Sequence, residues 1–159
     1  MTASRIVGFD PGSIRTGFGV IDVVQRRMQY VASGIVRAEG NTHLRRLESI
    51  CKGSGELLGK FRADELALEE VFVGKNAGTA VKLGQARGVV LAAAFDHGVP
   101  VFEYAARRIK LAVTGAGSAR KALVRQMVAS ILSLDTRPPE DSADALAAAI
   151  CHIHEKGRA

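Results

Sequence analysis

The chain has 159 residues, a length typical of one compact domain (residues 1–159) that buries its core without disulfides. Hydrophobic residues make up 47% and charged residues 24%, a mix that excludes a disordered chain. The formal net charge of +6 favours nucleic acid as a partner, although many basic proteins bind none. Cys51 and Cys151 are too few for a disulfide framework, so a reducing cytoplasm is expected.

Neither a targeting segment nor a membrane span is expected. Met1–Arg5 leads directly into an apolar strand pattern and lacks the layout of a signal peptide. Apolar runs all fall short of the roughly 18 residues that a span requires.

The first third of the chain predicts a meander of antiparallel strands. Arg5–Asp10 has the pattern of a strand and is closed by the turn Pro11–Ser13. Thr16–Asp22 and Met28–Arg37 predict two further strands.

A helix and a fourth strand are predicted next. Asn41 or Thr42 caps the helix, which runs to about Phe61. The residues expected on its apolar side are Leu44, Leu47, Ile50, Leu57 and Leu58. The strand is predicted over Asp64–Phe72.

The second predicted helix starts at Asn76, runs to about Asp96 and is ended by Gly98. It is rich in small residues: Gly78, Ala80, Gly84, Ala86, Gly88, Ala92, Ala93 and Ala94. Each glycine lowers the stability of a helix by roughly 1 kcal/mol relative to alanine. Close packing against another helix can compensate for this loss. Both internal packing and a dimer seam fit this pattern.

A strand over Val99–Tyr104 is predicted to lead into a basic segment, Ala105–Val113. Ser118 is the expected cap of a helix that runs to about Leu132.

Pro138 and Pro139 are expected to open the final helix, a favoured place for proline. Cys151–His154 near its end indicates an ordinary helix end, because adjacent helical residues point in different directions. The order of elements predicts an α/β fold, a mixed sheet of three antiparallel strands followed by parallel strands, with helices on both faces.

Four carboxylates are candidates for a metal site. Asp10 ends the first strand, Glu69 lies in the fourth, and Asp141 and Asp144 share one face of the last helix. Each also has a structural explanation, as a turn residue, a solvent-facing strand position or an acid complementing a helix dipole. Together they predict a site for two Mg²⁺ or Mn²⁺ ions, which prefer oxygen ligands and activate phosphodiester hydrolysis as a pair.

A basic stretch precedes the last two acids and predicts contacts with a phosphate backbone, although a solvated basic face also fits. Its members are Arg107, Arg108, Lys110, Arg120, Lys121 and Arg125. Phe72 lies on a glycine-containing loop, where an aromatic ring either stacks on a base or belongs to the core.

The chain resembles the RuvC-type Holliday junction resolvases over nearly its whole length. The matching segments, in the family's order, are Gly8–Ser13, Thr16–Val20, Leu68–Phe72, Lys75-Asn76, Lys82–Gly88, Val101–Arg107 and Asp144–Ala147. The Lys82–Gly88 and Phe102–Arg107 runs are the most specific of these.

The resemblance implies a ribonuclease-H-like fold and a homodimeric, metal-dependent endonuclease that nicks four-way junction DNA symmetrically, in recombination and repair. The family's catalytic acids match Asp10, Glu69 (not Glu70), Asp141 and Asp144. Partnership with the RuvA–RuvB branch-migration machinery is also implied.

The resemblance also implies DNA contacts. Lys110 and Lys121 match lysines near the DNA backbone, and Phe72 matches an aromatic near the junction centre. The remaining residues expected at DNA are Lys75, Asn76, Arg107 and Arg120.

Two other functions are compatible with parts of the sequence. The Asp10–Ser13 turn and the following hairpin also resemble the phosphate loop of actin-like kinases and ATPases, but those need a second lobe for which this length has no room. A catalytically silent junction-binding protein is the other, and the presence of all four acids does not favour it.

Overall fold

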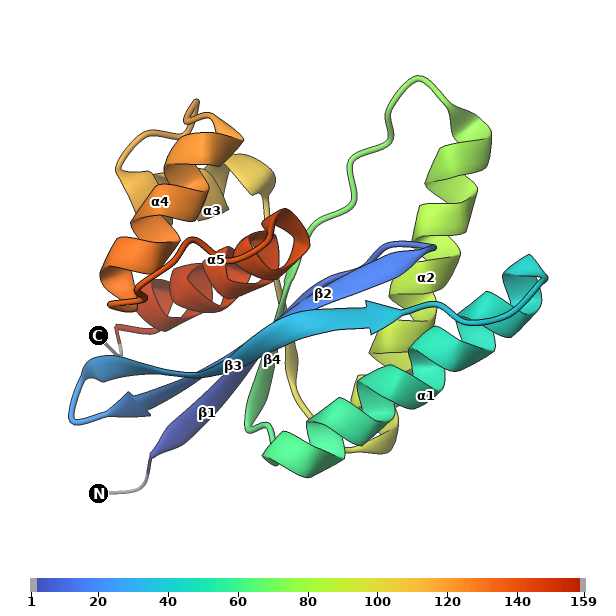
Figure 1. The fold of residues 1–159 in the computed structure, drawn as a ribbon, viewed down its shortest axis with the longest axis horizontal. Helices are drawn as coiled ribbons and strands as arrows, with labels where there is room; N and C mark the ends of the chain where they lie inside the picture. Colours follow the sequence, from blue (N-terminus) through green and yellow to red (C-terminus); the bar gives the residue numbers. More distant parts are fainter. Residues whose placement is uncertain (1–2, 158–159) are drawn as a thin grey trace.

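The structure, a computed structural model, describes residues 3–157, and these form one five-stranded mixed sheet with helices on both faces (Figure 1). The strand order is β3-β2-β1-β4-β5, with β3, β2 and β1 antiparallel and with β4 and β5 parallel to β1. This confirms the predicted mixed α/β sheet. In chain order the elements are β1 (Ser4–Asp10), β2 (Arg15–Val24), β3 (Arg27–Arg37), α1 (His43–Phe61), β4 (Glu65–Glu69), α2 (Ala77–Asp96), β5 (Val101–Tyr104), α3 (Ala106–Thr114), α4 (Lys121–Ile131) and α5 (Glu140–Glu155).

The central strands are buried on both faces, so they are almost continuously apolar. In β1, Ile6 joins the core beneath α5, whereas Val7 and Phe9 join the core beneath α1 and α2. Alternation along the strand therefore turns Gly8 and Asp10 toward α5, on the same face as Ile6.

The helices divide into two layers (Figure 1). α1 and α2 pack together on one face, and α5 covers β1, β2 and β4 on the other, with α3 and α4 packed on α5. Ala145–Ile153 of α5 is buried throughout. No helix within residues 3–157 is both long and apolar enough to span a bilayer.

Two predicted helix starts are confirmed by their caps. The Thr42 side chain accepts a hydrogen bond of 3.2 Å from the backbone N–H of Arg45, and Asn76 accepts one of 3.1 Å from that of Thr79. Each cap satisfies a backbone donor that the first turn of a helix leaves unpaired. Of the apolar side predicted for α1, however, Leu44 is wrong: it is 74% exposed, although its neighbour His43 contacts Gln85 of α2 at 2.7 Å.

The fourth strand is shorter than predicted. β4 ends at Glu69 rather than Phe72, because β5 ends at Tyr104 and leaves no partner strand beyond that point. The Glu70 N–H still reaches the Tyr104 carbonyl oxygen at 2.9 Å. Residues 70–79 are all exposed, so the strand becomes an open loop that leads into α2.

Other boundaries differ around the basic segment. Residues 106–114 form α3, a helix that was not predicted; Ile109 and Val113, four residues apart, anchor it in the core. Ser118 does not cap α4, whose N-cap is Arg120 without a side-chain hydrogen bond. β5 starts at Val101 rather than Val99.

The final helix begins after Pro139, which occupies its N-cap. Near the other end, His152 is fully buried and more than an ordinary helix-end residue. Its Nδ1 lies 2.7 Å from the Tyr104 hydroxyl and its Nε2 lies 2.5 Å from Glu65 Oε2. This network joins α5, β4 and β5, and it runs from Glu65 at the start of β4 to Tyr104 at the end of β5.

Candidate active site

Asp10 and Glu69 end two neighbouring parallel strands on the same face of the sheet. Phe9 pairs with Leu68 in the parallel register, so Asp10 and Glu69 stand next to each other at the following position. Both carboxylates therefore point to the side covered by α5.

Two glycines let α5 lie directly on the sheet. A Cβ atom on Gly8 would stand 1.9 Å from the backbone oxygen of Ala145, and one on Gly17 would stand 2.1 Å from that of Asp141. Any side chain at these positions would push the helix away. The close approach brings the first turns of α5, and with them Asp141 and Asp144, to the ends of β1 and β2.

Three of the four predicted acids line one cavity. Asp10, Glu69 and Asp144 share a space of about 230 Å³ with Lys110 and Lys121. A second cavity of about 190 Å³, lined also by Phe72 and Arg87, lies on the other side of Asp10 and Glu69. The two carboxylates thus stand between two hollows.

Asp141 takes a different position from the other three acids. It does not line the 230 Å³ cavity, and its Oδ2 lies 3.6 Å from Nε of Arg15. Its charge nevertheless contributes to raising the pKa of Asp10. Asp141 therefore stands at the rim of the carboxylate group and pairs with β2.

Burial and mutual repulsion perturb the carboxylates. Burial first, and then the charges of Asp144, Glu69 and Asp141, raise the pKa of Asp10 to about 7, against the smaller opposing effect of Lys121. Burial is also the largest reason why the pKa values of Glu69 and Asp144 are raised. Protonation of these carboxylates, or binding of cations in place of the protons, would relieve their repulsion and stabilise the site.

Lys121 is held by the acids around it. Its Nζ lies 2.7 Å from Glu140 Oε1 and 3.3 Å from Asp144 Oδ2. The hydrogen bond to Glu140 is the main reason why the pKa of Lys121 is raised, so the lysine stays charged. Lys121 supplies part of the positive charge that the site needs.

Hard oxygen donors are the ligands that Mg²⁺ and Mn²⁺ prefer, so the donor set and its raised pKa values fit divalent ions. Within residues 3–157, however, no three Asp, Glu, His or Cys side chains already stand close enough together to hold an ion. The carboxylates would have to move closer together to hold an ion.

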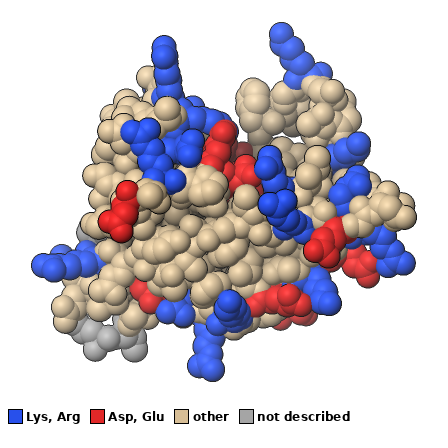
Figure 2. Space-filling view, in the orientation of Figure 1, with Lys and Arg blue, Asp and Glu red and all other residues tan. Residues whose placement is uncertain are grey.

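Basic side chains flank the acids on the surface (Figure 2). Arg107 and Arg120 are exposed, but two other arginines of the predicted basic stretch are engaged within the protein. Arg108 binds the carboxylate of Glu155 at 2.6 and 2.9 Å, and Arg125 donates to the Pro138 carbonyl oxygen at 3.0 and 3.1 Å. The stretch is thus only partly available to a ligand.

The loop after β4 extends from the site. Phe72 is 86% exposed, which rules out the interpretation of Phe72 as a core residue, and Lys75 is exposed as well. Asn76 is occupied as the cap of α2.

Three residues outside the predicted site contact the candidate acids or their neighbours. Arg87 donates a hydrogen bond to the backbone of Glu69, Arg15 pairs with Asp141, and Glu140 pairs with Lys121. The position of Arg87 in the Lys82–Gly88 run was a signal. The pairs of Arg15 and Glu140 depend on contacts between separate elements, which the sequence does not display.

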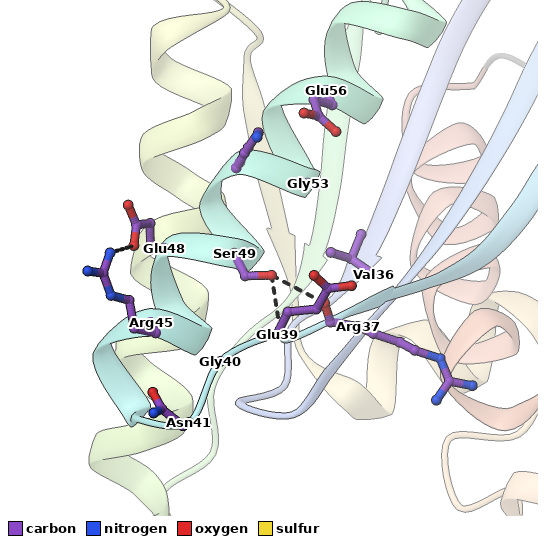
Figure 3. A pocket seen from close by; sticks show the side chains of 11 residues that line it. Val36, Arg37, Glu39, Gly40, Asn41, Arg45, Glu48, Ser49, Gly53 and Glu56 are labelled. Atoms are coloured by element: carbon purple, nitrogen blue, oxygen red, sulfur yellow. Dashed lines mark hydrogen bonds and ion pairs between the residues drawn. The ribbon is translucent and has the colours of Figure 1, made fainter.

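A larger hollow than these two lies elsewhere. It measures about 730 Å³, between the end of β3 and α1, and is lined by acids and bases in alternation (Figure 3). It contains none of the predicted site residues, and its mixed charge favours neither anions nor cations.

Comparison with known proteins identifies the family. The model of the family described as "Crossover junction endodeoxyribonuclease RuvC" matches residues 6–152. The chain is 52% identical over 149 residues to the RuvC of Photobacterium profundum, covering 94% of this chain and 86% of that protein. It is 48% identical over 155 residues to the RuvC of Chromohalobacter salexigens, covering 98% and 83%.

Solved structures agree. A structure of the T. thermophilus RuvC in complex with a Holliday junction substrate superposes with a TM-score of 0.89 at 35% identity, covering 96% of this chain and 94% of that one. The yeast mitochondrial Holliday junction resolvase, at 10% identity and a TM-score of 0.67, shares the fold. The fold is thus ribonuclease-H-like, and the chain belongs to the RuvC family of crossover junction endodeoxyribonucleases. Members of this family hydrolyse DNA phosphodiester bonds and in general use divalent metal ions.

Proposed function

We propose that this chain resolves four-way DNA junctions by nicking two opposed strands with the help of divalent metal ions. The observation that carries the proposal is the meeting of Asp10, Glu69 and Asp144 with two lysines around one cavity, in a chain of the RuvC family. Residues 1–159 would act as a single nuclease domain.

Asp10, Glu69, Asp141 and Asp144 are the proposed ligands of two Mg²⁺ or Mn²⁺ ions. When bound, these ions would lower the pKa of an attacking water and stabilise the charge of the leaving 3′ oxygen. Asp10 must lose its proton before it becomes a ligand, because its pKa is raised to about 7. Protons and metal ions would therefore compete for Asp10, and the metal concentration needed for cleavage should rise as the pH falls below about 7.

The lysines of the cavity are proposed to hold the scissile phosphate. Lys110 and Lys121 would offset charge that develops on it, as fixed cations do in other phosphoryl-transfer sites. For Lys121 this requires an exchange of partners, from Glu140 to the DNA.

The surrounding exposed residues are proposed to bind the DNA outside the cavity. Arg107 and Arg120 would contact the backbone, and Lys75 and Asn76 would do so from the loop after β4. Phe72 would stack on a base at the junction centre, which its 86% exposure favours.

A homodimer is proposed as the active form. Gly84 and Gly88 of α2 are exposed, and an added Cβ at either would meet nothing within 4 Å. Glycines with no packing role inside the chain favour a seam with a second copy over the internal-packing alternative. Two sites related by a two-fold axis would suit the symmetry of a four-way junction.

A cytoplasmic location and cooperation with the RuvA–RuvB branch-migration machinery complete the proposal. Cys51 and Cys151 are both unpaired, which suits a reducing compartment. Cooperation with RuvA–RuvB rests on family membership alone.

The test is cleavage of labelled four-way junction, duplex and single-stranded DNA side by side, with Mg²⁺, with Mn²⁺ and with EDTA. We expect paired nicks in the junction only when metal is present. Asp10→Asn, Glu69→Gln, Asp141→Asn and Asp144→Asn should each lose cleavage and keep junction binding. Binding without cleavage by the wild type would instead favour a catalytically silent junction-binding protein.

A further inference from the structure

Arg15 and Arg37 stand directly opposite each other as the last pair of the β2–β3 ladder. Residues opposite each other on antiparallel strands point to the same face, with their Cβ atoms about 4.5–5.5 Å apart. Like charges in such a pair repel each other and weaken the sheet. An anion bound between the two guanidinium groups would remove this repulsion.

The pair lies on the face of the sheet that α5 covers. Val36, the neighbour of Arg37, faces α1, since a Cβ atom on Gly53 would stand 2.6 Å from its Cγ1. Alternation turns Arg37 to the opposite face, and its guanidinium extends away from α1 (Figure 3). Gly17, two residues after Arg15, lies against Asp141, which places Arg15 on the same face.

Arg15 borders the carboxylates, and Arg37 stands beside Arg15 in the β2–β3 ladder. The Nε atom of Arg15 lies 3.6 Å from Oδ2 of Asp141, and the Arg15 side chain remains 60% exposed. Arg37 is exposed and, within residues 3–157, has no carboxylate at ion-pair distance. Two guanidinium groups are thus directed at solvent beside an acid of the candidate site.

Cations consequently flank the acids from two directions. On one side, Lys110 of α3 and Lys121 of α4 line the cavity. On the other side, Arg15 lies at the start of β2 and Arg37 at the end of β3. In Figure 2, acidic side chains at the start of α5 have basic side chains on both sides. A polyanion that crosses the carboxylates would meet positive charge before and after them.

We propose that Arg15 and Arg37 form a phosphate-binding pair for the DNA backbone, next to the scissile phosphate on the β2–β3 side. The proposal rests on the nuclease function proposed above and adds a contact outside the catalytic cavity. Guanidinium groups suit this role, because their fork of N–H donors matches two oxygens of a phosphodiester. The pair holds the strand in line as it passes over Asp141.

The test is the salt dependence of binding to a fluorescent four-way junction, measured in EDTA so that no cleavage occurs. Each phosphate contact contributes about 0.9 to the slope of log K against log salt concentration. We expect Arg37→Ala and Arg15→Ala each to lower the slope by about 0.9, and the double variant by about twice that. Arg37→Gln should behave as Arg37→Ala does.

Arg27→Ala is the matched control, since Arg27 is exposed at the other end of the same strand. Its slope should equal that of the wild type. Melting temperatures without DNA supply a second readout: Arg37→Ala should melt no lower than the wild type, because a like-charge contact is removed.

Wild-type binding with unchanged slopes in the Arg15 and Arg37 variants would overturn this inference and leave the nuclease function intact. An equal loss in Arg27→Ala would overturn it too, since net charge alone would then explain the effect. A wild type that neither binds nor cuts the junction would overturn the proposed function, and the inference with it.

Discussion

The guanidinium of Arg87 donates a hydrogen bond of 2.7 Å to the backbone carbonyl oxygen of Glu69. The arginine comes from α2, is almost buried, and also pairs with Glu103 of β5. It therefore ties the last residue of β4 to two other elements, at the point where the strand loses its partner. Because Glu69 is a proposed metal ligand, Arg87 fixes the backbone from which that ligand projects.

We expect Arg87→Ala to raise the Mg²⁺ concentration needed for half-maximal cleavage while junction binding in EDTA is retained. The carbonyl of Glu69 would lose its partner, a change that destabilises the protein by roughly 1–3 kcal/mol when the group is buried. Glu103→Gln is the control, since it leaves the Arg87–Glu69 bond in place and should shift the Mg²⁺ requirement less. If the two variants need the same Mg²⁺ concentration, Arg87 stabilises the fold and does not position Glu69 for metal binding.

The raised pKa of Asp10 predicts a pH-dependent stability in EDTA. Between the usual aspartate value of 3.8 and about 7, the folded protein holds a proton on Asp10 that the unfolded chain releases. This contribution to stability is therefore present at low pH and is lost as the pH rises through about 7. Thermal melts from pH 5 to pH 8 should show a steeper decline for the wild type than for Asp10→Asn.

At pH 8 in EDTA, Asp10→Asn should consequently melt higher than the wild type. Mg²⁺ should reverse this order, because it binds only the folded wild type. A variant that melts lower in EDTA at pH 8 would mean that repulsion among these acids does not destabilise the fold.

Glu69 and Glu70 should differ in catalysis although they are neighbours. Glu69 lines both cavities, whereas Glu70 is exposed and does not line the 230 Å³ cavity that holds Asp10 and Asp144. Glu69→Gln is expected to lose cleavage and Glu70→Gln to cleave within a few-fold of the wild type, in single-turnover assays on a labelled junction. The opposite result would move the proposed ligand by one residue.

Much of the fold could be predicted because the pattern of apolar residues is local. The apolar run in Arg5–Asp10 and the capping residues Thr42 and Asn76 are signals within a few residues of the structure they produce. The end of β4 depends instead on where β5 stops, at Tyr104, and that is a property of the partner strand. Likewise α3 is held by Ile109 and Val113 against a core that the segment itself does not reveal.

The candidate site was also only partly predictable from the sequence. Asp10, Asp141 and Asp144 could be selected because carboxylates at a strand end and at a helix start are visible in the sequence, whereas Glu69 was separated from Glu70 by the resemblance to the RuvC-type resolvases. The distinct position of Asp141 beside Arg15 could not, because it depends on how closely α5 approaches β2 at Gly17. The pairing of Lys121 with Glu140 also arises only when α4 and α5 are packed together.

The Lys121–Glu140 pair predicts opposite effects of two substitutions on DNA binding. Lys121→Ala should lower the salt slope of junction binding by about 0.9, the loss of one phosphate contact. Glu140→Gln should strengthen binding at low salt, since it frees Lys121 and removes a negative charge beside the DNA. Glu56→Gln, an exposed acid on α1, serves as the control for net charge. Weaker binding by Glu140→Gln would mean that Glu140 orients Lys121 for the phosphate.

Phe72 offers a separation of function from stability. Its side chain is 86% exposed on a loop whose residues 70–79 all face solvent, so the folded protein gains little from it. Phe72→Ala should therefore leave the free energy of unfolding within about 0.5 kcal/mol of the wild type. Stacking on an unpaired base contributes roughly 1–3 kcal/mol to binding, so the variant should bind and cut the junction markedly less well. Phe72→Tyr, which keeps a stacking ring, is expected to recover most of the activity.

A 2-aminopurine base at the junction centre gives a direct measurement: wild type and Phe72→Tyr should quench its fluorescence by stacking, and Phe72→Ala should not. Equal quenching by all three proteins would show that the ring of Phe72 does not stack on the bases at the junction centre.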